Sequence, residues 1–397
     1  MRKKAIAAAA LSATIFVSAA TAQVRPLADV YKTGRVKLIE EIRVSDRALP
    51  EGIVFQSPGG VAVDDKGRVY VADFDAHHLK VFGADGKFLR TIGRKGQGPG
   101  DFQGPASVEI GGGRIYIWES TNRRISVFDA EGKFIASTPF NPGAFGAFIR
   151  MRALPDDRLV VYYERGLAEG SMTSVPDGQD RVVELLSAEA KPMRTLYERK
   201  VRSSRLAWVA ELSRYVRVPF PYHPAVAMDV TPAGLVAVGL NDKNGFEVLD
   251  PDQGRLAAFS RPYQPVRLTE KDKQDHFGRF RMTVFKDNVK TVLPKPPEYI
   301  VKNTEFPDVL PAFRGLVADG EGFLWVHVYV ESRATNVFDI FDLKNGFLAR
   351  ISVEGASVGY DFTSSLSNRF AGGALWMIER DEDGYISLVK YRLASAR

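Results

Sequence analysis

An internal repeat near the N-terminal end constrains the fold of this chain more than any other feature. The segment Phe55–Pro58 (FQSP) returns as Phe102–Pro105 (FQGP), and Val69–Val71 (VYV) returns as Ile115–Ile117 (IYI), so the offset is 46 or 47 residues. Self-similarity at such a period is typical of architectures in which each copy packs against its neighbours. One copy cannot bury its own core, so we expect several copies side by side.

Each copy carries the signals of four short strands. In the first copy, short polar turns such as Asp64–Gly67 separate apolar runs at 61–63, 68–72, 79–82 and 88–92. The chain has 35 Gly and 22 Pro with 25 Phe and 14 Tyr, which favours many strands and tight turns over long helices. Four antiparallel strands in about 45 residues are typical of one blade of a β-propeller. The sequence therefore predicts an all-β propeller of four-stranded antiparallel blades.

The number of blades follows from weaker copies of the same pattern. After the first two copies, we expect further blades over 148–196, 225–259, 316–351 and 374–391, and the last of these ends before its fourth strand. The apolar-rich run Val36–Val44 precedes the first complete copy and could supply that strand. Such closure would remove an open sheet edge. We predict a single six-bladed domain over 23–397; an independent N-terminal hairpin beside a five-bladed ring is the alternative.

Two stretches of the chain resemble the NHL-repeat family of six-bladed β-propellers. They are FQSPGGVAVDDKGRVYVADFDAHHLKVFGADGKFLRTIG at 55–93 and GQGPGDFQGP at 96–105. The shared elements are a Phe-x-x-Pro start, an Asp-x-x-Gly turn and a Tyr-Val-Ala-Asp strand end, where the second copy has Glu119 in place of the Asp. The resemblance covers blades 1 and 2, and it implies the fold. It implies no activity, since most exported bacterial six-bladed propellers have no assigned activity and a fold does not carry a function.

The N-terminus predicts export. Basic residues at 2–4 precede the apolar stretch 5–17, and the small residues at 20–22 form a cleavage motif. These features are typical of a secretory signal peptide at 1–22, with an uncleaved anchor as the alternative. We therefore expect a periplasmic or secreted protein, and no later apolar run approaches the length of a membrane span. The chain has no cysteine, which excludes disulfides and thiolate metal sites.

Insertions into the blade pattern are expected at about 165–180, 195–222 and 266–312. Loops between second and third strands and connections between blades emerge on one face of a propeller, so all three insertions should gather there. Residues 195–222 hold six Lys and Arg against two Asp and Glu, and residues 266–312 hold nine against seven. The whole chain has a net charge of +6, and +3 without residues 1–22. An anionic partner would be drawn to the insert-bearing face, unless this is only an ordinary solvated surface.

Two insertions are expected to be partly helical. Thr269 could cap a helix in which one stripe is formed by Phe277, Phe280 and Val284. A second stripe is expected from Leu206, Val209 and Leu212, and prolines at 294, 296 and 297 should stop the first helix. These helices would pack onto the ring, either as decorations that bury their own apolar faces or as a functional lid.

Candidate site residues lie where the inner strands of the blades begin. His223 lies just before the inner strand of blade 4, and arginines occupy comparable places at the starts of blades 3, 5 and 6, namely Arg150, Arg152, Arg314 and Arg369. Guanidinium groups suit bidentate recognition of a carboxylate or phosphate. We predict a ligand-binding channel rim on the insert-bearing side; the alternative is that these residues form salt bridges and pack the rim.

Three function classes remain open. The first is a non-catalytic binding or scaffold module, whose partner would be a protein or an anionic small-molecule ligand. The second is a channel hydrolase or lactonase with a divalent cation held by Glu, Asn and Asp, for which only Asn368 is an obvious ligand. The third is a lyase with a three-histidine metal site, and the five histidines show no such spacing. We favour the first class, with a monomer, no nucleic-acid partner, no assignable catalytic residue and no cofactor, although a channel Ca²⁺ or Zn²⁺ stays open.

Overall fold

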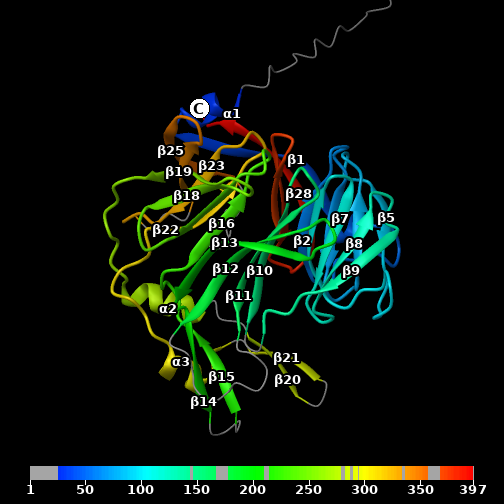
Figure 1. The fold of residues 1–397 in the computed structure, drawn as a ribbon, viewed down its shortest axis with the longest axis horizontal. Coiled ribbons are helices and arrows are strands. Elements are labelled where there is room, and N and C mark those ends of the chain that lie inside the picture. Colours follow the sequence, from blue (N-terminus) through cyan, green and yellow to red (C-terminus); the bar gives the residue numbers. More distant parts are fainter. Residues whose placement is uncertain are drawn as a thin grey trace, which may run out of the picture.

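The computed structural model describes residues 26–143, 146–166, 178–209, 214–278, 282–286, 289–293, 295–332, 336–355 and 367–396. Within these ranges the chain forms four separate four-stranded sheets, one eight-stranded sheet and two hairpins (Figure 1). The eight-stranded sheet contains two blades, so the ring has six. The signal peptide expected at 1–22 lies outside the described residues. None of the described helices is long and apolar enough to cross a membrane.

The first three blades follow the sequence pattern. Blade 1 consists of β2 (Pro58–Val63), β3 (Val69–Asp73), β4 (His78–Phe82) and β5 (Phe88–Ile92). Blade 2 consists of β6 (Pro105–Gly111), β7 (Arg114–Glu119), β8 (Arg124–Asp129) and β9 (Phe134–Pro139). Blade 3 consists of β10 (Ala147–Ala153), β11 (Leu159–Arg165), β12 (Gln179–Leu186) and β13 (Pro192–Val201). In each blade the strands are antiparallel and in chain order, with the first strand innermost.

The last three blades continue the ring. Blade 4 consists of β16 (Val226–Val230), β17 (Val236–Leu240), β18 (Gly245–Asp250) and β19 (Gly254–Ser260). Blade 5 consists of β22 (Phe313–Ala318), β23 (Leu324–Val328), β24 (Val337–Asp342) and β25 (Gly346–Glu354). Blade 6 consists of β26 (Asn368–Ala371), β27 (Ala374–Arg380), β28 (Ile386–Ser395) and the N-terminal strand β1 (Arg35–Ser45).

The N-terminal strand closes the ring, as the sequence predicted. Strand β1 pairs antiparallel with β28 from Val36 opposite Ser395 to Ser45 opposite Ser387. It also forms a short parallel ladder with β25, which joins blades 5 and 6 into one sheet. The preceding helix α1 (Leu27–Tyr31) is held by its fully buried tyrosine, whose hydroxyl donates to Asp319 Oδ2 over 2.6 Å. The alternative of a five-bladed ring with a separate hairpin is therefore wrong.

A buried acid at the end of each second strand repeats through blades 1 to 3. Asp73 accepts backbone N–H groups of the segment that leads into β2 and pairs with Lys80 over 2.7 Å. Glu119 fills the same place in blade 2, where it accepts a backbone N–H and pairs with Arg124 over 2.7 Å. In blade 3 the acid is Glu164, which is fully buried. The acid of the Tyr-Val-Ala-Asp motif thus anchors the chain, and either carboxylic acid suffices for this task.

The insertion expected at 195–222 is a hairpin and contains no described helix. Its first residues belong to β13, which extends to Val201, and the rest forms β14 (Ser204–Val209) paired with β15 (Arg214–Pro219). The helical stripe predicted from Leu206 and Val209 is therefore wrong; Leu212 lies outside the described residues. Apolar residues three apart in a short run do not distinguish a helix from a strand. Pairing between the two arms satisfies the backbone here.

The insertion expected at 266–312 is helical only in part. It contains α2 (Glu270–Gly278), a hairpin of β20 (Met282–Lys286) and β21 (Val289–Leu293), and α3 (Glu298–Asn303). The Thr269 cap is confirmed, since its hydroxyl and Asp272 Oδ2 lie 2.6 Å apart and the Asp272 N–H points back to it. The helix ends at Gly278, a poor helix former, so Val284 lies in β20 instead of on a helical stripe. Phe280 and Pro294 lie outside the described residues.

The two longer insertions pack against each other at one end of the ring. Ile300 of α3 is buried against Ala207 and Val218 of the β14–β15 hairpin. Arg205 of β14 donates to Asn303 over 2.6 Å and to Glu305 over 3.2 Å. Figure 1 shows this group of elements at the end opposite α1. The gathering of these two insertions on one face is confirmed; most of the insertion expected at 165–180 lies outside the described residues.

Candidate ligand site in the central channel

The strand registers align one position at the same depth on all six inner strands. We count two residues back from the first residue of the turn that joins the first and second strand of each blade. The set, called the ion layer below, is Ala62, Glu109, Arg152, Asp229, Val317 and Arg369. Consecutive blades 2, 3 and 4 therefore place an acid, an arginine and an acid side by side, and blade 6 adds a second arginine.

Arg152 lies between two carboxylates. Its Nε donates to Asp229 Oδ1 over 2.6 Å, and its Nη1 donates to Glu109 Oε1 over 2.7 Å. The residue is 6% exposed. Burial alone would lower the pKa of Arg152, but the two carboxylates raise it above its ordinary value. Arg152 is thus a permanent cation that neighbouring blades hold in a fixed orientation.

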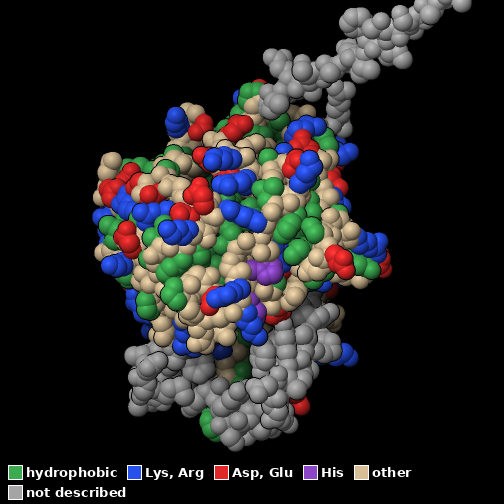
Figure 2. Space-filling view, turned by 90° about the vertical axis from the view of Figure 1, so that its right-hand side faces the viewer, with side chains coloured by type: hydrophobic (Ala, Val, Ile, Leu, Met, Phe, Trp, Pro, Cys, Tyr) green, Lys and Arg blue, Asp and Glu red, His purple; other side chains and the backbone are tan. Residues whose placement is uncertain are grey.

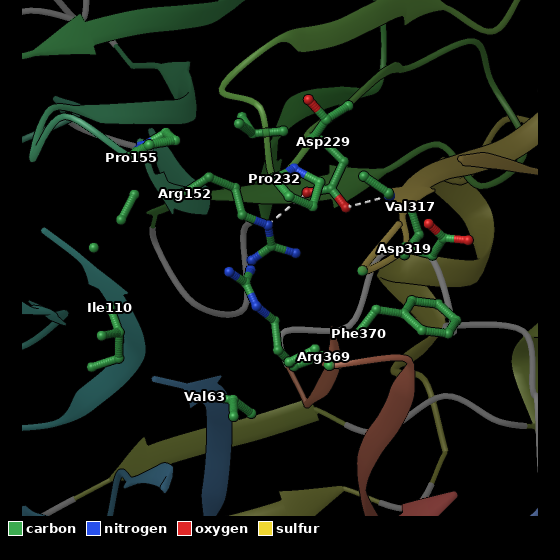
Figure 3. A pocket seen from close by; sticks show the side chains of 18 of the residues that line it. Val63, Ile110, Arg152, Pro155, Asp229, Pro232, Val317, Asp319, Arg369 and Phe370 are labelled. Carbon is green, nitrogen blue, oxygen red and sulfur yellow. Dashed lines mark hydrogen bonds and ion pairs between the residues drawn. The ribbon is translucent and has the colours of Figure 1, made fainter. Parts of the chain in front are cut away.

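Arg369 approaches the same carboxylate from the other side of the channel. Its Nη1 lies 3.2 Å from Glu109 Oε2 and 3.3 Å from Oε1. Ala62 stands between them in ring order, and its small side chain leaves room for this reach. Glu109 is therefore shared by two guanidinium groups, which face each other across the channel (Figure 3).

Arg150 adds a third cation two residues earlier in β10. It is 3% exposed, and its Nη1 lies 3.5 Å from Asp229 Oδ1. Burial and the nearby Arg152 lower the pKa of Arg150 to about 10, so it stays protonated at neutral pH. Burial would raise the pKa of Asp229, but Arg152 and Arg150 hold it below its usual range. Three arginines thus lie around the two carboxylates of Glu109 and Asp229.

A cavity of about 420 Å³ opens above the ion layer, and all six blades line it. Its walls include apolar side chains, called the apolar collar below, namely Val63, Ile110, Leu154, Pro155, Pro232, Val317 and Phe370. Figure 3 shows Arg152 and Arg369 at the floor and most of the collar around them. Within the described residues, Arg152 Nη2 and the Nε and Nη2 atoms of Arg369 make no hydrogen bond. Two sets of donors are therefore left for a ligand.

The structure brings only part of the predicted rim together. Arg150, Arg152 and Arg369 form one cluster, but their cavity is bounded by the turns between first and second strands, at the mouth opposite the insertions. The expected position on the insert-bearing side is therefore wrong for Arg152 and Arg369. The inner strands line the channel along its length, so a residue a few positions into an inner strand lies deep inside the channel.

Arg314 and His223 do not join this cluster. The guanidinium of Arg314, at the start of β22, lies 4.2 Å from the ring centre of Tyr329. The ring of His223 lies 5.2 Å from that of Phe220, in the connection between the β14–β15 hairpin and blade 4. Burial and then Arg202 lower the pKa of His223. A role for either residue in ligand binding stays a prediction.

Sequence reasoning missed Glu109 and Asp229. Each is a single acid inside an otherwise apolar inner strand, and that pattern was the available signal. Both carboxylates already bind Arg152, so a channel cation would have to displace a guanidinium from them. Across the described ranges, no group of three or more His, Asp or Glu side chains could hold a metal ion. Asn368 lines the same cavity.

Comparisons with known proteins agree with this architecture. Residues 50–185, which hold blade 1, blade 2 and most of blade 3, match a family described as 6-bladed beta-propeller. A Bacteroides fragilis protein described as exported is 10% identical with a TM-score of 0.50, and the match covers 91% of this chain and 96% of that one.

Other similar structures are more distant in shape. A member of the DUF4221 family from Bacteroides vulgatus is 8% identical with a TM-score of 0.45, and the match covers 92% of this chain and 100% of that one. Virginiamycin B lyase from Staphylococcus aureus is 14% identical with a TM-score of 0.36, covering 89% and 99%. No curated protein matches the sequence significantly. The chain is a six-bladed β-propeller, and its residues 50–185 match the 6-bladed beta-propeller family.

Proposed function

We propose that this protein is an exported binding module that holds a small anionic ligand in its central channel. The observation that carries the proposal is the pair of guanidinium groups of Arg152 and Arg369, which come from opposite blades and keep donors directed at one cavity. Hydrogen bonds between ionised partners are the strong ones, and arginine is well suited to planar oxyanions.

Binding without turnover fits the chemistry of the cavity floor. Its two central acids, Glu109 and Asp229, are both engaged by arginines and are poor general bases in that state. Figure 2 shows basic and acidic side chains interspersed on the outer surface of blades 1 and 2. This surface therefore has no patch of one charge that would attract an anion more strongly than the channel does. Export is supported by the leader at 1–22 and accords with the description of the Bacteroides fragilis protein.

Calorimetric titration with acetate, inorganic phosphate and sulfate tests the proposal. We expect at least one of these anions to bind, and Arg369→Gln to weaken that binding at least tenfold, because a charged hydrogen bond contributes about 1.5–3 kcal/mol. Arg94→Gln is the matched control, since the Arg94 side chain is 85% exposed and pairs with Asp101 at the surface. Equal binding by wild type and Arg369→Gln, or no binding of any anion, would contradict the proposal.

A second candidate function is protein docking on the insert-bearing face. Trp208 of β14 is 56% exposed there, and residues 195–222 are strongly basic. An exposed tryptophan in a basic surface suits an acidic partner. Addition of poly-glutamate should shift the fluorescence of wild type and leave Trp208→Phe unchanged. The same shift in both proteins would contradict docking at this face.

A further inference from the structure

We infer that the ligand of the central channel is an apolar monocarboxylate, with its carboxylate at the ion layer and its body in the apolar collar. This inference rests on the proposed function and names the class of ligand. Three features of the cavity carry it: the geometry of the free donors, the balance of charge around them and the character of the walls.

The free donors suit a flat head group. Arg152 and Arg369 face each other from blades 3 and 6, and each has one edge fixed by Glu109. The donors that remain are Arg152 Nη2 and the Nε and Nη2 atoms of Arg369, and both residues line the same cavity. A carboxylate has two oxygens in a plane, so each oxygen can accept from one guanidinium. Because Glu109 and Asp229 hold Arg152 before a ligand arrives, little side-chain freedom is lost on binding.

The charge around the floor favours a single negative charge. The floor holds the three arginines Arg150, Arg152 and Arg369 beside the two acids Glu109 and Asp229. A second negative charge on the ligand would meet these two acids at short range. It would also pass carboxylates at the mouth, since the cavity is lined there by Asp64, Asp65 and Asp319. Phosphate dianions and tricarboxylates are therefore disfavoured.

The walls favour an apolar body. The ion layer is charged on blades 2, 3, 4 and 6, and it is apolar on blades 1 and 5, which carry Ala62 and Val317. Above it, the collar contributes Val63, Ile110 and Phe370 from the inner strands of blades 1, 2 and 6. A cavity of about 420 Å³ in which every blade adds an apolar side chain to walls that also carry charged groups can hold a small amphipathic organic molecule. A small hydrophilic anion would leave these walls in contact with water.

Titration with phenylacetate, acetate, phenylacetamide, phosphate and citrate tests the inference. Phenylacetate should bind at least tenfold more tightly than acetate, because its ring is removed from water. Phenylacetamide, which has the same shape without the charge, should bind at least tenfold more weakly than phenylacetate. Arg369→Gln should remove most of this difference, and the control Arg94→Gln should keep it. Val63→Ser should weaken phenylacetate about threefold and leave acetate unchanged.

The outcomes separate the two proposals. Tighter binding of phosphate or citrate than of phenylacetate, with dependence on Arg369, would overturn the ligand class and leave the anion-binding function standing. Equal affinities for phenylacetate and phenylacetamide would also overturn it. If no anion binds in a manner that depends on Arg369, the proposed function itself fails. Should Arg369→Gln not fold, the wild-type ranking of phenylacetate, phenylacetamide and phosphate still decides the ligand class.

Discussion

Replacement of Arg152 by methionine tests the ion layer most directly, because the side chain keeps its length and loses its charge and hydrogen bonds. Arg152 is 6% exposed and donates to Asp229 over 2.6 Å and to Glu109 over 2.7 Å. Removing one partner of a buried ion pair costs about 3–5 kcal/mol. Both carboxylates keep a second arginine, Arg150 or Arg369. We therefore expect the free energy of unfolding to fall by about 3 kcal/mol at pH 7, the lower end of that range.

The loss should depend on pH. Burial would raise the pKa of Asp229, but Arg152 and Arg150 hold it below its usual range. A carboxyl group whose pKa is lowered in the folded state stabilises the fold above its unfolded pKa of about 3.9, and this contribution is lost as the pH falls through the folded pKa. The methionine variant lacks most of this contribution. The difference between the two proteins should be largest at pH 7 and shrink below about pH 4.

Urea unfolding followed by tryptophan fluorescence at pH 7 and at pH 3.5 measures both expectations. Arg94→Gln is the control, because a single exposed ion pair contributes about 0–1 kcal/mol. A loss below about 1 kcal/mol for Arg152→Met at pH 7 would refute the claim that Arg152 neutralises two buried acids. A loss of equal size at both pH values would show that packing, and not charge, holds the ion layer together.

Three further predictions concern the frame of the propeller. Burial raises the pKa of Asp319 to about 6, so wild-type stability should fall as the pH rises from about 4 to about 6; thermal melting should show this slope, and Asp319→Asn should flatten it. Deletion of residues 26–45 exposes the edges of β28 and β25, so we expect a lower melting temperature and light scattering from aggregates; a monomeric variant that melts as wild type would contradict the closure. A Cβ atom on Gly60 would lie 2.7 Å from the backbone N of Val108, so Gly60→Ala should cost more than 1 kcal/mol in urea unfolding, whereas Gly278→Ala, which meets nothing within 4 Å, should be neutral.

Local patterns were enough to predict the scaffold. The FQSP and FQGP starts, the alternating apolar runs and the glycine turns predicted blades 1 and 2, and the unpaired run Val36–Val44 predicted the closure with β28. Each of these signals depends on neighbours in sequence or on a rule that sheet edges must be covered. The Thr269 cap belongs to the same category, since a cap is decided within four residues.

Local patterns were misleading where the same spacing of apolar residues fits both a helix and a β-hairpin. Residues 204–219 have apolar residues three apart, which also suits an alternating hairpin, and the pairing of β14 with β15 decided between them. The predicted extension of the Thr269-capped helix α2 to Val284 is wrong for the same reason, since Val284 belongs to β20.

The sequence by itself determined that this chain is a closed ring of six blades. The reason is that each blade, and the strand that closes the ring, is recognised from apolar runs and turns that are close together in the sequence. Only the tertiary structure decided that Glu109, Arg152, Asp229 and Arg369 share one layer. These residues are as much as 260 positions apart, and they meet because the registers of four separate inner strands bring them to the same depth of the channel. The charge of that layer and the mouth of the channel that its free donors face depend on the assembled ring, because no single blade contains more than one of these four residues.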